Sequence, residues 1–168
     1  MNKVLDPYSI EAQMNAKLST EWYDRIANTI TKCPFCDLKS KYFVIEGTHC
    51  VLSVNLFPYE DGHLMVIPKR HVEKIAQISQ EETLETQDLL SKGIKLLKTE
   101  FNYNSINVLY REGGEKAGQS LLHIHTHLLP VDRILNYRQG GFDLKKKKIK
   151  YPPIEIAQRL RKLAKVLF

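Results

Sequence analysis

The chain has 168 residues, of which 43% are hydrophobic and 26% are charged, and its formal net charge is +6 at pH 7. This composition is ordinary for one soluble domain with its own hydrophobic core. No apolar stretch is long enough to span a bilayer, and residues 1–13 contain no apolar signal segment. Both observations argue against a membrane protein or a secreted protein, and we expect a cytoplasmic one.

The first predicted element is a helix over residues 9–30. Its apolar residues recur every four positions, which places them on one helix face. They are Ile10, Met14, Leu18, Trp22, Ile26 and Ile30. We expect residues 1–32 to form an N-terminal helical extension.

A Cys-x-x-Cys pair, Cys33 and Cys36, follows this helix. Such a pair is half of a zinc site or a thiol redox motif. A redox pair lies after a strand and at the start of a helix, whereas here a helix precedes the pair and the strand-like residues 42–45 follow it. A zinc site fits this order better and needs two more ligands. The alternative is two reduced cysteines in a turn, and the cysteine content indicates a reducing compartment.

Apolar and β-branched runs predict the strands of a sheet. The predicted strands are 41–46, 49–55, 63–68, 105–111 and 121–131. Cys50 is expected to be buried in the second strand. His49 and His63 have no evident partner, and we expect both to be structural.

A second helix is predicted from residue 79 to about residue 100. Ser79 and Glu82 form a capping-box pattern at its start. Its apolar side chains lie largely on one side. They are Leu84, Leu89, Leu90, Ile94 and Leu97. We expect an α+β fold, with a meander-like antiparallel sheet of five strands, this long helix packed across one face, and helices at both ends of the chain.

The C-terminal part of the chain is basic, because residues 133–168 hold 11 basic and 2 acidic residues. The Lys145–Lys148 run can contact nucleic acid or the extra phosphates of a polyphosphate substrate. No aromatic residues interleave with these lysines, so we favour a solvated linker and do not favour nucleic acid as a partner. A last helix begins at Pro152-Pro153 and carries an apolar stripe that must be buried on this domain or on a partner. The stripe is Ile156, Leu160, Leu163 and Leu167.

Residues 113–120, Gly-Gly-Glu-Lys-Ala-Gly-Gln-Ser, lie between the last two predicted strands. Glycine permits conformations in which successive backbone N–H groups point into one concavity, which fits a phosphate oxygen. Alone, this loop would indicate only a hairpin turn. Because three histidines follow it, the loop predicts a phosphate site.

These histidines, His123, His125 and His127, alternate with other residues in the last predicted strand. Successive side chains of a strand point to opposite faces, so the three imidazoles should share one face. Neighbours on one face are roughly 6 to 7 Å apart, too far for all three to bind one metal ion at roughly 2.0–2.1 Å. At most one or two of them can hold the same metal.

The loop and the histidines together resemble the signature of the histidine triad (HIT) family of nucleotide hydrolases and transferases. The matching residues are Gly118, Gln119, Ser120, His123, His125, His127, Leu128, Leu129 and Pro130. Residues 55–71 resemble the family's nucleoside-pocket loop and the strand after it. The resemblance predicts a single HIT domain over residues 1–168, with its core at 33–135 and a basic linker and amphipathic helix at 136–168.

By this resemblance, His125 attacks the α-phosphorus of a nucleotide and forms a nucleotidyl-histidine that water or another acceptor resolves. Imidazole suits this role because, with a pKa of about 6.5, it is largely neutral at pH 7. One ring nitrogen attacks while the other donates its proton, and we expect a backbone carbonyl to accept it. His127, Ser120 and Gln119 would assist at the phosphate or the leaving group, and Gly118 would help to bind the nucleotide.

The nucleoside side of the predicted pocket depends on Asn55 and Leu56. Asn55 matches the position at which the family contacts the ribose, and its amide can both donate and accept hydrogen bonds. Leu56 is either an apolar neighbour of the base or ordinary core. Glu112 departs from the family, in which many members carry Asn or Gln near the phosphate. Its carboxylate would repel a phosphate unless Arg111 or Lys116 neutralised it.

The resemblance also implies a metal and a partner. Zinc-containing members, including relatives that transfer nucleotides to sugar phosphates, use ligands at positions that match Cys33, Cys36, His71 and His123. The chain looks like a zinc-containing bacterial-type member similar to diadenosine polyphosphate hydrolases and phosphorylases. Closed coordination of this kind makes the zinc structural. Family members of this size form homodimers through the long helix and a central strand.

Three functions remain open from the sequence. The favoured one is a nucleotide hydrolase or nucleotidyl transferase that cleaves at the α-phosphate of dinucleoside polyphosphates or nucleoside phosphoramidates. The second is a non-catalytic nucleotide-binding or signalling module. The third is a DNA-end deadenylating enzyme, which only the lysine run supports and which salt-dependent binding of an oligonucleotide would reveal.

Overall fold

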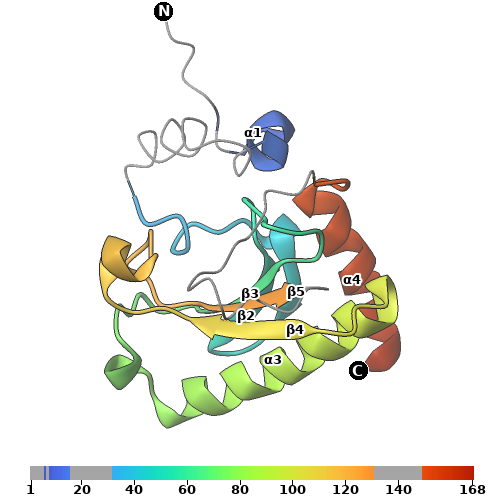
Figure 1. Cartoon of the computed structure of the whole chain (residues 1–168). Helices are drawn as coiled ribbons and strands as arrows, with labels where there is room; N and C mark the ends of the chain where they lie inside the picture. Colours follow the sequence, from blue (N-terminus) through green and yellow to red (C-terminus); the bar gives the residue numbers. More distant parts are fainter. Residues whose placement is uncertain (1–5, 7, 16–31, 131–148) are drawn as a thin grey trace, which may run out of the picture.

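The computed structural model describes residues 6, 8–15, 32–130 and 149–168. The described helices are α1 (Ile10–Asn15), α3 (Gln80–Phe101) and α4 (Pro153–Leu167), with short 3-10 turns η1 (Ser40–Tyr42), η2 (Ile75–Gln77) and η3 (Gly114–Ala117). The strands are β1 (Phe43–Glu46), β2 (Cys50–Val54), β3 (Leu64–Pro68), β4 (Ile106–Tyr110) and β5 (Thr126–Pro130). They form the expected α+β fold, in which α3 runs along one face of a five-stranded sheet (Figure 1). None of the described helices is long and apolar enough to cross a membrane.

The strands of the sheet are all antiparallel to their neighbours, in the order β1-β2-β3-β5-β4. The expected meander is wrong at its last step, because β4 does not pair with β3. After α3 the chain enters the sheet at its edge as β4, and β5 then fills the position between β4 and β3. As an interior strand, β5 pairs Leu128 with Leu64 on one side and with Val108 on the other. This position satisfies the backbone hydrogen-bonding groups of both its edges.

The main core lies between the sheet and helices α3 and α4. Leu52, Leu64 and Leu128 belong to it and are 0% exposed. Helix α3 comes so close to the sheet at Gly93 that a Cβ there would lie 2.5 Å from Leu128 Cδ1. Leu84, which the sequence placed on the buried side of this helix, is 64% exposed. It precedes Gly93 by nine positions, which is half a turn out of phase at roughly 100° per residue, so it faces away from the sheet.

The capping box at the start of α3 is confirmed. The Glu82 N–H donates to Ser79 Oγ at 3.2 Å, and the Ser79 N–H donates to Glu82 Oε2 at 2.8 Å. Cys50 is 0% exposed in β2, as expected. Helix α1 is the described part of the predicted helix at 9–30, while residues 16–31 lie outside the described residues.

Helix α4 begins at Pro153 and buries its apolar stripe on this chain, since Ile156 and Leu160 are 3% and 0% exposed. It packs against β1, β2 and α3. Arg161 anchors it by donating to the carbonyl oxygen of Phe43 at 2.6 Å. The Lys145–Lys148 run that precedes this helix lies outside the described residues.

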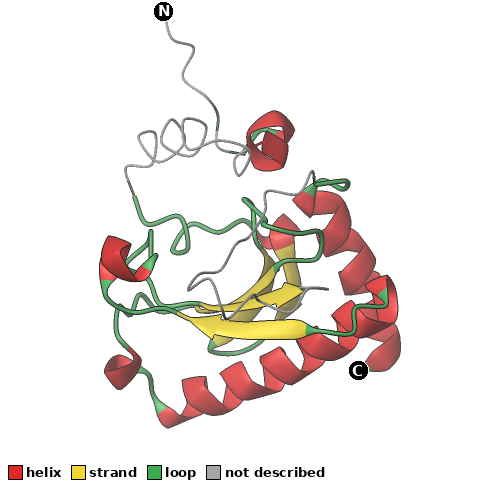
Figure 2. Ribbon diagram, in the orientation of Figure 1, coloured by secondary structure: helices red, strands yellow, loops and turns green. Residues whose placement is uncertain are grey.

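The sheet face opposite α3 is covered by loops (Figure 2). A smaller apolar cluster of Val51, Met65 and Ile67 lies on this face, and Phe35 and Leu38 of the loop before η1 pack against it. Because His127 pairs with Met65 in the β3–β5 ladder, its side chain shares this face. The loop-covered face therefore carries the histidines.

Candidate active site and metal group

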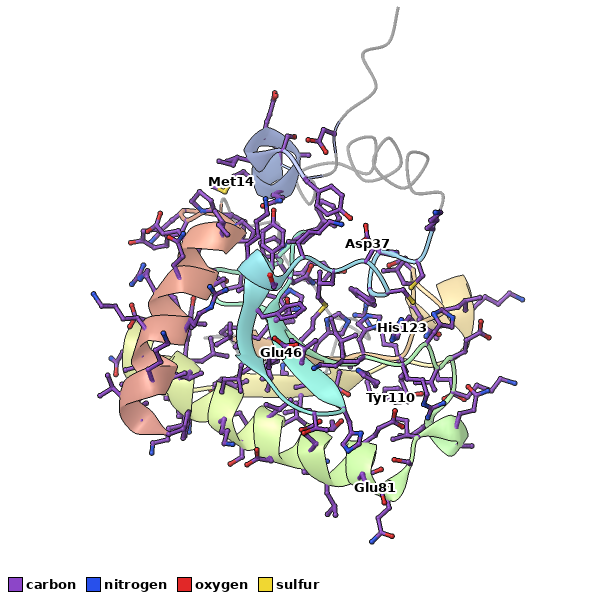
Figure 3. All side chains as sticks on the ribbon, turned by 180° about the vertical axis from the view of Figure 1, so that it is seen from behind. Met14, Asp37, Glu46, Glu81, Tyr110 and His123 are labelled. Atoms are coloured by element: carbon purple, nitrogen blue, oxygen red, sulfur yellow. The ribbon has the colours of Figure 1, made fainter. Side chains whose placement is uncertain are left out.

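Four predicted metal ligands come together from three separate segments. Cys33 and Cys36 precede η1, His71 follows β3, and His123 precedes β5. One ligand atom from each lies within 4.8 Å of the other three. Figure 3 shows His123 inside the molecule, near the loop that carries Asp37. The group is therefore compact enough to surround one ion.

The orientation of the two imidazoles fits a metal. His123 Nδ1 lies 3.4 Å from Cys33 Sγ and 3.6 Å from Cys36 Sγ, while its Nε2 lies 2.9 Å from the carbonyl oxygen of Pro68. His71 Nδ1 lies 3.2 Å from Cys36 Sγ, and its Nε2 lies 3.6 Å from a carboxylate oxygen of Glu73. Metal-bound histidines commonly donate their second N–H to a carbonyl or a carboxylate, and the Nε2 of His123 lies at hydrogen-bond distance from such a carbonyl. Two thiols and two Nδ1 atoms are a ligand set that suits tetrahedral Zn²⁺.

The expectation that all three histidines of the row lie on one strand is wrong. Strand β5 begins at Thr126, so His123 and His125 lie in the irregular segment before it. There the backbone pairs outside the β5 ladders, since the Ile124 N–H donates to the carbonyl oxygen of Val72 at 2.7 Å. The bend lets His123 face the cysteines while His125 stays beside His127.

His125 has the surroundings of a neutral imidazole. It is 8% exposed, and its ring centroid lies 4.9 Å from that of Phe35 and 4.7 Å from that of His127. Nδ1 lies 2.8 Å from the carbonyl oxygen of His123, which can only accept a hydrogen bond, so Nδ1 carries the proton. The lone pair is then on Nε2. Burial lowers the pKa of His125 below its ordinary value.

His63, which the sequence left without a partner, belongs to this site. Its Nε2 lies 2.9 Å from Nδ1 of His127, and both rings are buried. His63 lies two residues before Met65, the register partner of His127, so it is the diagonal neighbour of His127 on the same face. The pairing of β3 with β5 is the signal that would have revealed it, and that pairing was not predicted.

The glycine loop differs from the phosphate cradle expected from the sequence. The N–H groups of Gly113 and Gly114 both donate to Gln119 Oε1, each at 3.1 Å. The concavity they form is thus filled by an oxygen of the chain itself. Gln119 is 3% exposed, and its Nε2 has no partner among the described residues. The donor presented by this loop is the amide of Gln119, while Ser120 is exposed beside it.

The Glu112 carboxylate accepts hydrogen bonds from two neutral groups, and neither is one of the cations expected to neutralise it. Its carboxylate accepts from the Ile75 N–H at 2.8 Å and from the hydroxyl of Tyr110. Burial and the adjacent Glu112 raise the pKa of Tyr110 to about 12. Arg111 instead donates to the carbonyl oxygen of Gly118 at 3.0 Å and so ties the two ends of the glycine loop together.

The two predicted nucleoside residues have different surroundings. Asn55 Nδ2 lies 3.3 Å from His63 Nδ1, and its Oδ1 accepts from the Phe57 N–H at 2.9 Å. Asn55 is therefore connected to the histidines through His63. Leu56 is 9% exposed and belongs to the main core, so ordinary packing accounts for it.

Comparison with known proteins adds a family match and several relatives. The model of the HIT domain matches residues 39–134, more than half of the chain. An uncharacterised HIT-like protein of Mycoplasma genitalium is 36% identical over 108 residues, which cover 61% of this chain and 75% of the relative. The AP-4-A phosphorylase of Mycobacterium tuberculosis is 29% identical over 104 residues, covering 62% of this chain and 53% of the relative.

A bis(5'-adenosyl)-triphosphatase of Saccharomyces cerevisiae is 34% identical over 103 residues, covering 58% of this chain and 50% of the relative. The chain thus spans about half the length of both named enzymes. Among solved structures, a Zn-bound histidine triad family protein from Mycobacterium smegmatis aligns with a TM-score of 0.65 and 20% identity, covering 81% of this chain and 95% of that one. At this identity the alignment shows a shared fold.

Proposed function

Because the chain belongs to the HIT family, we propose that it is a nucleotide hydrolase or nucleotidyl transferase that cleaves at the α-phosphate. Its substrates are dinucleoside polyphosphates or nucleoside phosphoramidates, and the relatives named AP-4-A phosphorylase and bis(5'-adenosyl)-triphosphatase support the first of these two classes. The observation that carries the proposal is the 2.8 Å contact between His125 Nδ1 and the carbonyl of His123. It leaves the Nε2 lone pair of a buried imidazole as a nucleophile.

In the first step, Nε2 of His125 bonds to the α-phosphorus, and the bond from phosphorus to the leaving oxygen or nitrogen breaks. The ring becomes cationic, and the His123 carbonyl stabilises it through the Nδ1 proton. In the second step, either water bonds to the phosphorus and releases a proton to solvent, or an unprotonated phosphate oxygen bonds to it, and His125 is displaced as a neutral imidazole. The products of hydrolysis are a nucleoside monophosphate and the protonated leaving group.

The neighbours of His125 complete this scheme. His127 donates to a phosphate oxygen or to the leaving group, and His63 holds it in place at 2.9 Å. The Nε2 of Gln119, which has no partner within the described part of the chain, donates to the negative charge that develops in the transition state. Ser120 and Gly118 border the same phosphate. Asn55 binds the ribose hydroxyls.

We also infer that Cys33, Cys36, His71 and His123 hold one structural Zn²⁺. Four protein ligands leave no open coordination position, so the ion would stabilise the fold and would not activate water. No step of the reaction depends on it. The three cysteines, all within the described residues, form no disulfide, which suits a reducing compartment such as the cytoplasm, and cell fractionation would test that location.

A homodimer is the assembly that we propose. Strand β4 forms one edge of the sheet, and Val108 on it is 49% exposed. An exposed edge strand with an apolar side chain favours pairing with a second chain. Sedimentation velocity should give a dimer for the parent protein and a monomer for Val108→Lys. A monomeric parent at micromolar concentration would contradict the proposal.

The test of the reaction is chromatography of the products formed from diadenosine polyphosphates and from adenosine phosphoramidate. We expect the parent to release AMP and His125→Ala to lose at least about a hundredfold in rate. His49→Ala is the matched control, since His49 is exposed and its side chain is outside the site. Binding without turnover by the parent would contradict the proposal and favour a binding module.

A further inference from the structure

The loop between β2 and β3, residues 55–63, carries two residues of the proposed site. Asn55 lies at its start and His63 at its end, and the Asn55 N–H donates to the carbonyl oxygen of His63 at 2.9 Å. His63 in turn contacts His127. Any displacement of this loop would therefore move both the proposed ribose contact and the support of His127.

Asp61, within this loop, connects it to the C-terminal segment of the chain. Its carboxylate accepts from the Lys150 N–H at 3.1 and 3.2 Å and from the Tyr151 N–H at 3.1 Å. The residue is only 7% exposed. Bonds from N–H groups to a buried carboxylate are stronger than those between neutral groups. The C-terminal segment lies outside residues 39–134, the part of the chain that matches the HIT domain.

The same segment also packs behind the loop. Tyr151, Pro153 and Ile156 line a small cavity together with Asn55 and His63. The cavity measures only about 10 Å³, barely the space of one water molecule. These residues are thus close-packed support for the loop and leave no room for a ligand.

The loop also contacts helix α3 and Tyr103. Gly62 has a φ of 81°, and a Cβ there would lie 2.9 Å from Leu97 of α3. The hydroxyl of Tyr103 donates to the carbonyl oxygen of Asp61 at 2.9 Å. Helix α3 and Tyr103 hold the loop from one direction, while the Asp61 carboxylate provides its polar connection to residues 150 and 151.

We propose that Asp61 is a positioning residue for nucleotide binding, and that residues 149–156 are a functional part of the site. The carboxylate fastens the C-terminal segment behind the loop and so fixes Asn55 and His63 in their places. This inference rests on the proposed function for its kinetic consequences, while its structural part concerns the order of the loop and can be measured without any ligand.

The test compares Asp61→Ala and Asp61→Asn with Arg161→Gln as the control. Asp61→Asn keeps one acceptor oxygen and should restore part of the loss. Arg161 also anchors α4, but to the carbonyl groups of Ser40, Lys41 and Phe43 at β1 and η1. Each protein is studied as the whole 168-residue chain. Hydrogen exchange of residues 55–63 is measured without ligand. The Kd for AMP is measured separately, as are KM and kcat for a diadenosine polyphosphate.

We expect Asp61→Ala to speed exchange in residues 55–63 and to raise the Kd for AMP and the KM roughly five- to tenfold, with a smaller change in kcat. The exchange rate, Kd and KM of Asp61→Asn should lie between those of this variant and the parent. Arg161→Gln should leave the exchange rate, Kd and KM unchanged even if its Tm falls. An Asp61→Ala protein with a lower Tm but parental exchange and Kd would overturn the proposal. A parent that binds no AMP would refute the proposed function, and the exchange data would then still decide whether Asp61 orders the loop.

Discussion

The Glu85 carboxylate on α3 shows how one side chain can hold a turn. It accepts from the N–H groups of Thr48, His49 and Cys50 at 2.7, 2.6 and 2.6 Å, between β1 and β2. Burial raises the pKa of this carboxyl, but the three hydrogen bonds outweigh burial, and the pKa lies below its ordinary value. The ionised form is therefore the one that stabilises the fold.

We predict that Glu85→Gln lowers the free energy of unfolding by about 2 kcal/mol at pH 7, because hydrogen bonds to a charged group are lost. This value is in the lower part of the range for such bonds, since Glu85 is partly exposed. A lowered folded-state pKa means that this contribution is complete above the unfolded pKa of about 4.3 and is lost as the pH falls through the folded value. Urea unfolding at several pH values should thus show the two proteins converging in acid.

Glu46→Gln is the control for this prediction. Glu46 pairs with Lys69 at 3.0 Å, but its side chain is 56% exposed, and exposed pairs contribute roughly 0–1 kcal/mol. An effect of Glu85→Gln no larger than that of Glu46→Gln, or one that does not depend on pH, would show that Glu85 does not stabilise the turn.

At the scale of elements, periodicity predicted β1 to β4 and α3 within a few residues, because apolar spacing reflects which face each segment buries. It placed the start of the last strand at residue 121, whereas β5 begins at Thr126. It could not predict which strands pair. The position of β5 between β3 and β4 is a long-range choice, and the partnership of His63 with His127 depends on it. The metal ligands could be predicted from the sequence, because the prediction uses residue types and a family resemblance. The irregular segment before β5 could not be predicted, because an alternating His-x-His-x-His pattern also suits a strand.

We predict that Gly93→Ala destabilises the protein although alanine favours helix by about 1 kcal/mol. The new Cβ would lie 2.5 Å from Cδ1 of Leu128, a side chain that is 0% exposed in the core. Relieving this overlap requires α3 to move away from the sheet, which costs about 1–3 kcal/mol. We therefore expect a net loss of about 1 kcal/mol in chemical denaturation. Ser91→Ala, at an exposed position of the same helix, should be neutral or slightly stabilising, and equal gains in both variants would contradict the prediction.

At the scale of the whole molecule, the metal group of Cys33, Cys36, His71 and His123 joins three segments that are far apart in the chain. It ties the loop before η1 to the segments that follow β3 and precede β5. The His123 backbone carbonyl that faces His125 belongs to one of the four ligand residues. An ion held there would thus stabilise the fold and the proposed nucleophile together.

We predict about one zinc per chain in protein purified without chelator, and loss of that zinc in Cys36→Ser. Removal of the ion should lower the Tm by roughly 5 °C or more, since each kcal/mol of lost stability shifts the Tm of a protein of this size by about 2–4 °C. Cys50→Ser is the control because Cys50 is buried in β2 outside the metal group. We expect this variant to unfold at a lower temperature and to keep its zinc. Elemental analysis combined with calorimetry separates the two effects. Zinc-free parent protein whose Tm does not change on addition of zinc or chelator would exclude a structural metal, and the four residues would then be held together by hydrogen bonds and packing alone.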